Sequence, residues 1–175
     1  MKQLQIGTPA TQFAAKNIYG SEVKLDLLKG QRVYLSFLRT ASCPFCNMQV
    51  HRLIQKQKDW KKKGIVTIAV FASSSESILQ YAGKQNPTFI ILADPDETLY
   101  KSYKIGSSAW GLFKAMLRVK TLMTIMVKGY FNMKTIFHKP VLTGDFLIND
   151  EGIIEHVYYG KDFGDHISFE LIDNW

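Results

Sequence analysis

Residues 32–46 read RVYLSFLRTASCPFC, and this stretch decides the fold. Its first half is a short apolar run of the kind that forms a buried strand. From Asn47 to Trp60, apolar residues recur among Gln, Lys and Arg, as is typical of a helix with one solvated face. Cys43 and Cys46 therefore lie where a predicted strand gives way to a predicted helix.

The spacing of these two cysteines indicates dithiol redox chemistry. They are the only cysteines in the 175 residues. Unpaired backbone N–H groups and the positive dipole end of a helix favour a thiolate, which is the nucleophilic form of cysteine. Pro44 suits the first helical turn, where its missing N–H costs nothing. We expect Cys43 to attack, and Cys46 to resolve the resulting mixed disulfide. Cys46, one turn further in, should be more buried and have the higher pKa.

Metal binding and structural burial are the alternatives for the cysteine pair. A structural zinc site needs four ligands, and no second cysteine pair is present. A copper site would need a histidine brought in by folding. The four histidines are scattered along the chain: His51, His138, His156 and His166. We expect redox chemistry with no metal and no bound organic cofactor, because the sulfurs themselves carry the electrons.

Composition predicts one globular domain over residues 1–175. The chain has a mass of 20.0 kDa, is 46% hydrophobic and contains 13% aromatic residues, which is enough to build a packed core. No apolar h-region of a secretory signal is visible, and no apolar run approaches the roughly 18 residues of a membrane span. We therefore expect a cytoplasmic protein, in which a cysteine pair is more often catalytic than structural.

Predicted strands and helices alternate along most of the chain. We expect strands at 13–17, 22–25, 32–38, 65–71, 88–93, 144–148 and 153–159. Helices are expected from 47, 74 and 94, and near the C-terminus within 165–174. Alternation of this kind predicts an α/β layered domain, and the final hairpin predicts a mixed sheet.

The positive charge is concentrated in one segment. Residues 101–140 contain eight Lys and Arg and no acids, so the net charge of +7 leaves the rest of the chain at −1. This distribution argues against a nucleic-acid-binding protein. Within 106–139, apolar residues recur at spacings of 3 and 4, which predicts an amphipathic, methionine-rich helical insert. We favour packing of this insert on the domain or on a dimer mate over a surface for a partner or an anionic membrane.

Several segments resemble thioredoxin-fold redoxins of the AhpC/TSA type, specifically the peroxiredoxin-like branch with a C-P-F-C motif. The matching segments are 6–13, 34–46, 94–100, 144–152 and 158–166. The resemblance implies a thioredoxin-like mixed sheet flanked by helices, with an N-terminal β-hairpin extension and a helical insert before the last hairpin. It also implies a thiol-disulfide oxidoreductase that reduces disulfides or peroxides. Its electrons would come from a thiol donor of the thioredoxin or glutathione type.

The chain also departs from the motifs of the peroxiredoxins and thioredoxins that it resembles. Peroxiredoxins resemble P-x-x-x-T-x-x-C; here Thr40 holds the Thr position, but Ser36 replaces the Pro. Thr143 holds the place of the cis-proline that faces the dithiol in thioredoxins. Because the distant peroxide-orienting Arg is also missing, we expect slower peroxide oxidation than in true peroxiredoxins, with disulfide exchange the better activity.

The neighbours of the cysteines have competing interpretations. Arg39 either favours the Cys43 thiolate or is a solvated surface residue. Thr40 either binds the Cys43 sulfur or caps the helix region, and His166 is expected to cap the terminal helix. Two other functions stay open: a peroxidase proper, and a non-catalytic binding module that acts through the basic insert.

Overall fold

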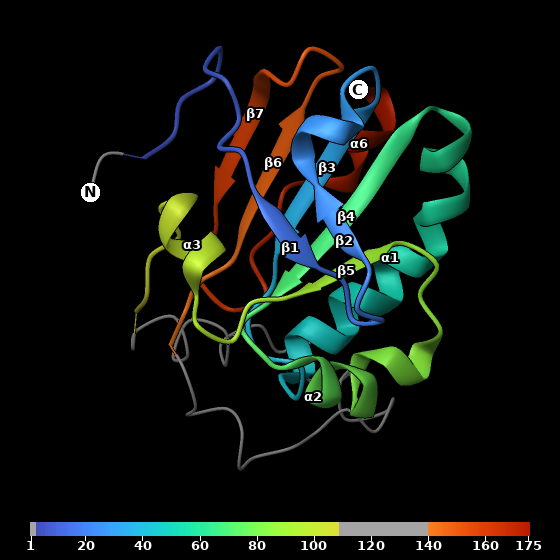
Figure 1. Cartoon of the computed structure of the whole chain (residues 1–175), viewed down its shortest axis with the longest axis vertical. Helices are drawn as coiled ribbons and strands as arrows, with labels where there is room; N and C mark the ends of the chain where they lie inside the picture. The colour runs from blue at the N-terminus through green and yellow to red at the C-terminus, as the bar shows by residue number, and fades with distance from the viewer. Residues whose placement is uncertain (1–2, 109–139) are drawn as a thin grey trace.

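A five-stranded mixed sheet forms the centre of the protein, and its strand order is β5-β4-β3-β6-β7. The computed structural model describes residues 3–108 and 140–175 (Figure 1). The strands are β1 (Ala14–Lys16), β2 (Glu22–Lys24), β3 (Arg32–Phe37), β4 (Ile65–Phe71), β5 (Ile90–Ala93), β6 (Gly144–Ile148) and β7 (Ile154–Tyr159). The helices are α1 (Pro44–Lys62), α2 (Ser75–Gln80), α3 (Thr98–Ser102) and α6 (Phe169–Asn174), with 3₁₀ turns η1 (Leu25–Leu28) and η2 (Ala82–Gln85).

Strand β3 is the middle of the sheet and carries the chain to the cysteines. It pairs in parallel with β4 and antiparallel with β6, so that Ser36 lies opposite Asp145. Strands β4 and β5 are parallel, whereas β6 and β7 form an antiparallel hairpin. The almost uninterrupted apolar sequence of β4 fits a strand that is covered on both faces.

Alternation along β3 sends successive side chains to opposite faces of the sheet. Val33, Leu35 and Phe37 belong to the core on the face that also contains residues of α3. Tyr34 points to the opposite face and packs with residues of α1 and α6. Because Ser36 is two residues from Tyr34, its hydroxyl also lies on the face covered by α1.

Helix α1 follows directly from the turn that contains the cysteines. Cys43 is its N-cap residue and Pro44 occupies its first turn, as the sequence predicts. The C-terminal helix α6 is fastened to α1 through Asp173, which accepts hydrogen bonds from Lys56 Nζ at 2.6 Å and Trp60 Nε1 at 2.8 Å. This contact holds the far end of α1 against the sheet.

The predicted α/β mixed sheet and both predicted hairpins are confirmed, including the N-terminal extension formed by β1 and β2. The last helix is shorter than its predicted segment, because it begins only at Phe169. The predicted insert at 106–139 lies outside the described residues, apart from its first three. Within the described ranges, no helix combines the length and apolar character needed to cross a membrane.

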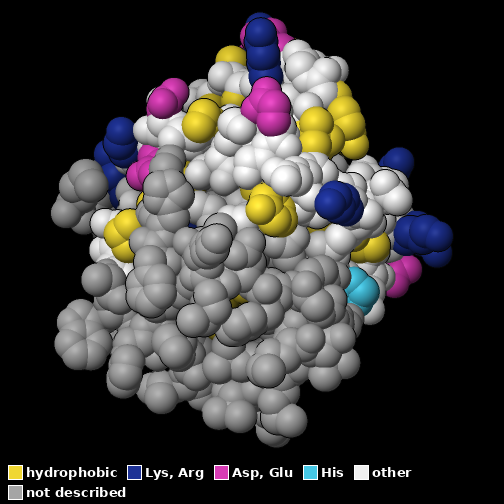
Figure 2. Space-filling view, turned by 90° about the horizontal axis from the view of Figure 1, so that it is seen from below, with side chains coloured by type: hydrophobic (Ala, Val, Ile, Leu, Met, Phe, Trp, Pro, Cys, Tyr) yellow, Lys and Arg dark blue, Asp and Glu magenta, His cyan; other side chains and the backbone are white. Residues whose placement is uncertain are grey.

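The described part of the protein has balanced charge. Seven of the 22 Lys and Arg residues are Lys2 and the cations within 109–139, so the described residues carry 15 cations and 15 acids. Figure 2 shows positive and negative side chains interspersed over the described part of one face. The excess positive charge of the chain is therefore contributed by residues 1–2 and 109–139.

Candidate active site

The turn between β3 and α1 holds both cysteines in fixed positions. The N–H of Cys43 donates to the carbonyl of Thr40 at 3.0 Å. The side chain of Asn47 donates to the carbonyls of Ala41 at 2.6 Å and Cys43 at 3.0 Å, which closes the turn onto the helix. A long helix thus begins at Cys43 with its first backbone N–H groups beside the sulfurs, and these favour negative charge there.

The two thiols are buried and chemically unequal. Cys43 is 1% exposed and Cys46 is 0% exposed, and both are free thiols. A hydrogen bond from the Cys46 thiol, supported by the Arg39 charge and opposed by burial, lowers the pKa of Cys43 to about 6. Burial, followed by contact with Cys43, raises the pKa of Cys46 well above its ordinary value. At neutral pH this arrangement favours one thiolate, on Cys43.

Cys46 has a backbone partner in addition to Cys43. The N–H of Arg39 donates to Cys46 Sγ over a distance of 3.1 Å. This N–H belongs to the segment that directly follows β3, so the backbone at the end of the central strand contributes a hydrogen-bond donor to the dithiol. A donor at this position stabilises negative charge on Cys46, against the penalty of burial.

Arg39 is a buried member of the site, with 1% of its side chain exposed. The surface interpretation of Arg39 is therefore wrong. Its guanidinium lies 4.2 Å from the centre of the Phe163 ring, in a cation–π arrangement. Its charge is one of the causes of the lowered pKa of Cys43. The sequence gives no sign of this burial, because Phe163 is 124 positions away.

Thr40 lies next to Arg39 and is 5% exposed. Its carbonyl holds the turn, whereas its hydroxyl oxygen is buried without a hydrogen-bond partner among the described residues. Neither predicted contact of the hydroxyl, a bond to the Cys43 sulfur or a cap, is present. A buried hydroxyl without a partner is rare and leaves a donor available to a small polar ligand.

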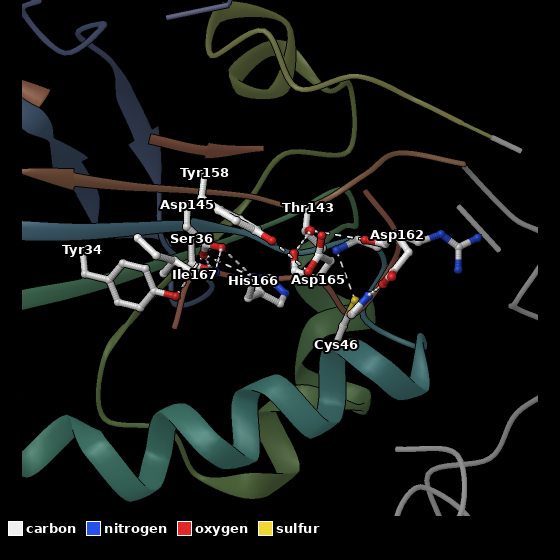
Figure 3. A network of polar contacts seen from close by, with 12 residues as sticks. Tyr34, Ser36, Cys46, Thr143, Asp145, Tyr158, Asp162, Asp165, His166 and Ile167 are labelled. Atoms are coloured by element: carbon white, nitrogen blue, oxygen red, sulfur yellow. Dashed lines mark hydrogen bonds and ion pairs between the residues drawn. The ribbon is translucent and has the colours of Figure 1, made fainter. Parts of the chain in front are cut away.

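Thr143 fastens the loop that follows β7. Its hydroxyl donates to the carbonyl of Asp162 at 3.3 Å and to that of Asp165 (Figure 3). Gly160 is required at the start of this loop, because a Cβ there would lie 1.9 Å from Thr143 Oγ1. Further along, a Cβ on Gly164 would lie 3.0 Å from the Phe45 ring, so the loop packs on the cysteine turn. Thr143, just before β6, thus holds in place the loop that packs on the cysteine turn.

A buried polar network beneath this loop was missed by sequence reasoning. The Asp145 carboxylate is 0% exposed and accepts hydrogen bonds from Tyr34 at 2.9 Å, Ser36 at 2.7 Å and the N–H of Ile167 at 3.0 Å. His166 Nδ1 lies 3.0 Å from the same carboxylate, so the prediction that His166 caps the terminal helix is wrong. Figure 3 shows these side chains converging from β3, β6 and the segment before α6.

The signal for this network was present but incomplete. Asp145 is an acid between Gly144 and the apolar residues of β6, and Ser36 is a hydroxyl residue within the apolar run of β3. The pairing of these two positions depends on the register of β3 against β6, which no local pattern specifies.

A family model and a curated relative point to one family, and solved structures share the fold. The model of the AhpC/TSA family matches residues 6–157. The chain is 26% identical over 175 residues to peroxiredoxin Bcp of Escherichia coli K12, covering 100% of this chain and 97% of the relative. Among solved structures, peroxidoxin BcpB of Mycobacterium tuberculosis superposes with a TM-score of 0.67 at 13% identity, covering 90% and 86% of the two chains. A thiol:disulfide interchange protein DsbE, described as putative, from Chlorobium tepidum gives a TM-score of 0.58 at 21% identity, with the same coverage of 90% and 86%.

Proposed function

The chain belongs to the AhpC/TSA family and is a thiol-dependent oxidoreductase, and from this premise we propose that it reduces peroxides with Cys43 as the attacking thiol and Cys46 as the resolving thiol. The observation that carries the proposal is the inequality of the two sulfurs. Cys43 has its pKa lowered to about 6 by the Cys46 thiol and by Arg39, so it is ready to act as a nucleophile near neutral pH.

The reaction begins with attack of the Cys43 thiolate on the outer oxygen of a peroxide. A sulfur–oxygen bond forms, the oxygen–oxygen bond breaks, and the leaving oxygen takes up a proton as water or an alcohol. Cys43 is then a sulfenic acid. Cys46 attacks this sulfur, a disulfide forms, and the sulfenic oxygen leaves as water with the Cys46 proton. Two electrons from a thiol donor return both cysteines to the reduced state.

Two neighbours of Cys43 support a peroxide as the substrate. The missing distant Arg was the reason to expect slow peroxide oxidation, yet Arg39, four positions before Cys43, brings a buried cation whose charge acts on the Cys43 sulfur. The unpartnered Thr40 hydroxyl adds a donor in the same turn. Charges and donors fixed before reaction stabilise the negative charge that develops on the leaving oxygen. Since Cys43 is 1% exposed, a molecule as small as hydrogen peroxide also suits the site better than a folded disulfide protein.

Disulfide exchange is the second candidate function. The attacking and resolving thiols lie within one turn, as the exchange of a mixed disulfide requires. The comparisons do not choose between the two activities, because a peroxidoxin and a protein titled as a thiol:disulfide interchange protein share the fold.

Peroxiredoxins use thiol reductants, and we propose a donor of the thioredoxin or glutathione type. A reducing, cytoplasmic setting is part of this proposal, since both sulfurs must return to the thiol form. Contact of the basic insert with a dimer mate also remains a proposal.

The test is stopped-flow oxidation of the reduced protein by hydrogen peroxide and, separately, by oxidised glutathione. We expect rapid oxidation by peroxide, a Cys43–Cys46 disulfide as the product, and no reaction in Cys43→Ser. A faster reaction with the disulfide would select the second function. No oxidation by either reagent would refute both.

A further inference from the structure

One peptide group links Tyr100 to the resolving thiol. The N–H of Arg39 donates to Cys46 Sγ at 3.1 Å. The carbonyl of the same peptide group belongs to Leu38 and accepts a hydrogen bond from the Tyr100 hydroxyl. We propose that Tyr100 is a positioning residue for Cys46, which strengthens and aims the backbone donor that stabilises the Cys46 thiolate. This inference rests on the proposed role of Cys46.

The structure holds Tyr100 rigidly at this peptide. Tyr100 is 1% exposed, and its ring packs edge-on against Phe37 with 5.1 Å between the ring centroids. The Asp94 carboxylate accepts the N–H groups of Thr98 at 2.9 Å, Leu99 at 2.8 Å and Tyr100 itself at 3.2 Å. Helix α3, although it has only five residues, is thereby anchored where β4 and β5 end.

The peptide group is fixed on the sheet side as well. The N–H of Leu38 donates to the carbonyl of Val70 at 2.9 Å, and the carbonyl of Arg39 accepts from the N–H of Ala72 at 2.9 Å. The Tyr100 hydroxyl also lies 2.9 Å from the Val70 carbonyl oxygen. Burial raises the pKa of Tyr100 well above its ordinary value, with the Cys46 charge as the next cause, so the hydroxyl keeps its proton and acts as a donor.

A hydrogen bond to the carbonyl of a peptide group polarises the group and makes its N–H a stronger donor. The Cys46 thiolate is needed twice in the cycle. It attacks the Cys43 sulfenic acid, forming the sulfur–sulfur bond while the sulfur–oxygen bond breaks, and the leaving oxygen takes up the proton that Cys46 gave up and departs as water. It is also the leaving group when an external thiol attacks Cys43 in the disulfide. Both steps should slow when the donor weakens, whereas the first attack on peroxide is made by Cys43, whose pKa of about 6 keeps it largely ionised at neutral pH.

The chain offers a matched control in Tyr103. This second buried tyrosine donates its hydroxyl to the carbonyl of Thr11 at 2.7 Å, away from the dithiol. It packs against Phe37 with the same centroid distance of 5.1 Å. The variants Tyr100→Phe and Tyr103→Phe therefore each remove one buried hydroxyl and keep the ring.

The experiment mixes each reduced protein with hydrogen peroxide and follows two events by quenching and mass spectrometry. Loss of the Cys43 thiol should proceed at the wild-type rate in both variants. Closure of the disulfide should be about threefold slower in Tyr100→Phe alone, as expected when a charge-assisted hydrogen bond loses roughly a third of its strength. The pH profile of closure should also move to higher pH in this variant, which a loss of packing alone would not produce.

A second variant keeps the test decisive if Tyr100→Phe fails to fold. Incorporation of 3-fluorotyrosine at position 100 preserves the ring and makes the hydroxyl a stronger donor. Closure should then be faster, with its pH profile moved to lower pH. Closure rates and profiles equal to those of wild type in either folded variant overturn the role of Tyr100. Absence of peroxide oxidation in the wild type would instead refute the proposed function.

Discussion

Replacement of the buried carboxylate in Asp145→Asn should destabilise the protein substantially. The carboxylate accepts three hydrogen bonds, from two hydroxyls and one backbone N–H, and also faces His166. An amide offers one acceptor oxygen and turns its NH₂ group toward neighbours that are themselves donors. Part of the network must therefore lose its partner.

The size of the effect follows from the number of bonds. A hydrogen bond to a charged group contributes about 1.5–3 kcal/mol, against about 0.5–1.5 kcal/mol for a neutral pair. Loss of about 1 kcal/mol at each of three bonds gives about 3 kcal/mol, and removing a buried charge offsets part of it. We expect a net loss of about 2–3 kcal/mol, or a Tm lowered by about 5–10 °C for a chain of this size.

Urea unfolding followed by far-UV circular dichroism measures this change directly. The control is Asp150→Asn, the same substitution at an exposed position in the β6–β7 turn, where we expect a change below about 0.5 kcal/mol. Equal stabilities of the two variants would show that the Asp145 network contributes little, and would refute the reasoning.

Of four further predictions, two concern the dithiol, one the loop after β7 and one the insert. After mild peroxide treatment, mass spectrometry should show an intramolecular Cys43–Cys46 disulfide as a loss of two protons, whereas Cys46→Ser should accumulate a sulfenic acid; a stable intermolecular dimer of the wild type would contradict this. Because the pKa of Cys43 is lowered to about 6, its thiolate fraction rises as the pH passes through that value, so its alkylation by iodoacetamide should rise there and precede that of Cys46; preferential labelling of Cys46 would reverse the assigned roles. Gly160→Ala places a Cβ 1.9 Å from a hydroxyl oxygen, and thermal unfolding should show a loss of about 1–3 kcal/mol; an unchanged Tm would mean that the loop shifts freely. If the insert only packs internally or in a dimer, Met116→Asp and Met123→Asp should lower the Tm or dissociate the dimer. Binding of the wild type to acidic vesicles that weakens as salt rises would argue for a membrane role instead.

Local sequence signals were enough to predict the sheet, the hairpins and the position of the cysteines. The run before Cys43, the proline in the first turn and the mixed helix that follows are each specified within about fifteen residues. Their physical causes, strand burial and helix start, act over the same short range. These features could therefore be predicted without knowledge of the tertiary fold.

The surroundings of the dithiol were not predictable in this way. Arg39 is adjacent to the turn, but whether it lies in solvent or under Phe163 depends on how the loop after β7 returns to the site. Tyr100 acts on Cys46 only through the Leu38–Arg39 peptide group, which follows β3 and lies 62 positions earlier in the chain. Contacts between distant segments decide such roles, and a single sequence does not specify them.

Asp145 shows how far a physical reading of one residue can go. The Asp145 carboxylate lies on β6, between β3 and β7, and is 0% exposed; an unpartnered buried charge costs several kcal/mol. An acid there consequently predicts at least one buried donor on a neighbouring strand. Which donor it meets depends on register, since a shift of one residue would replace Ser36 by an apolar side chain on the opposite face. The serine at position 36 is thus the partner that the buried Asp145 carboxylate requires.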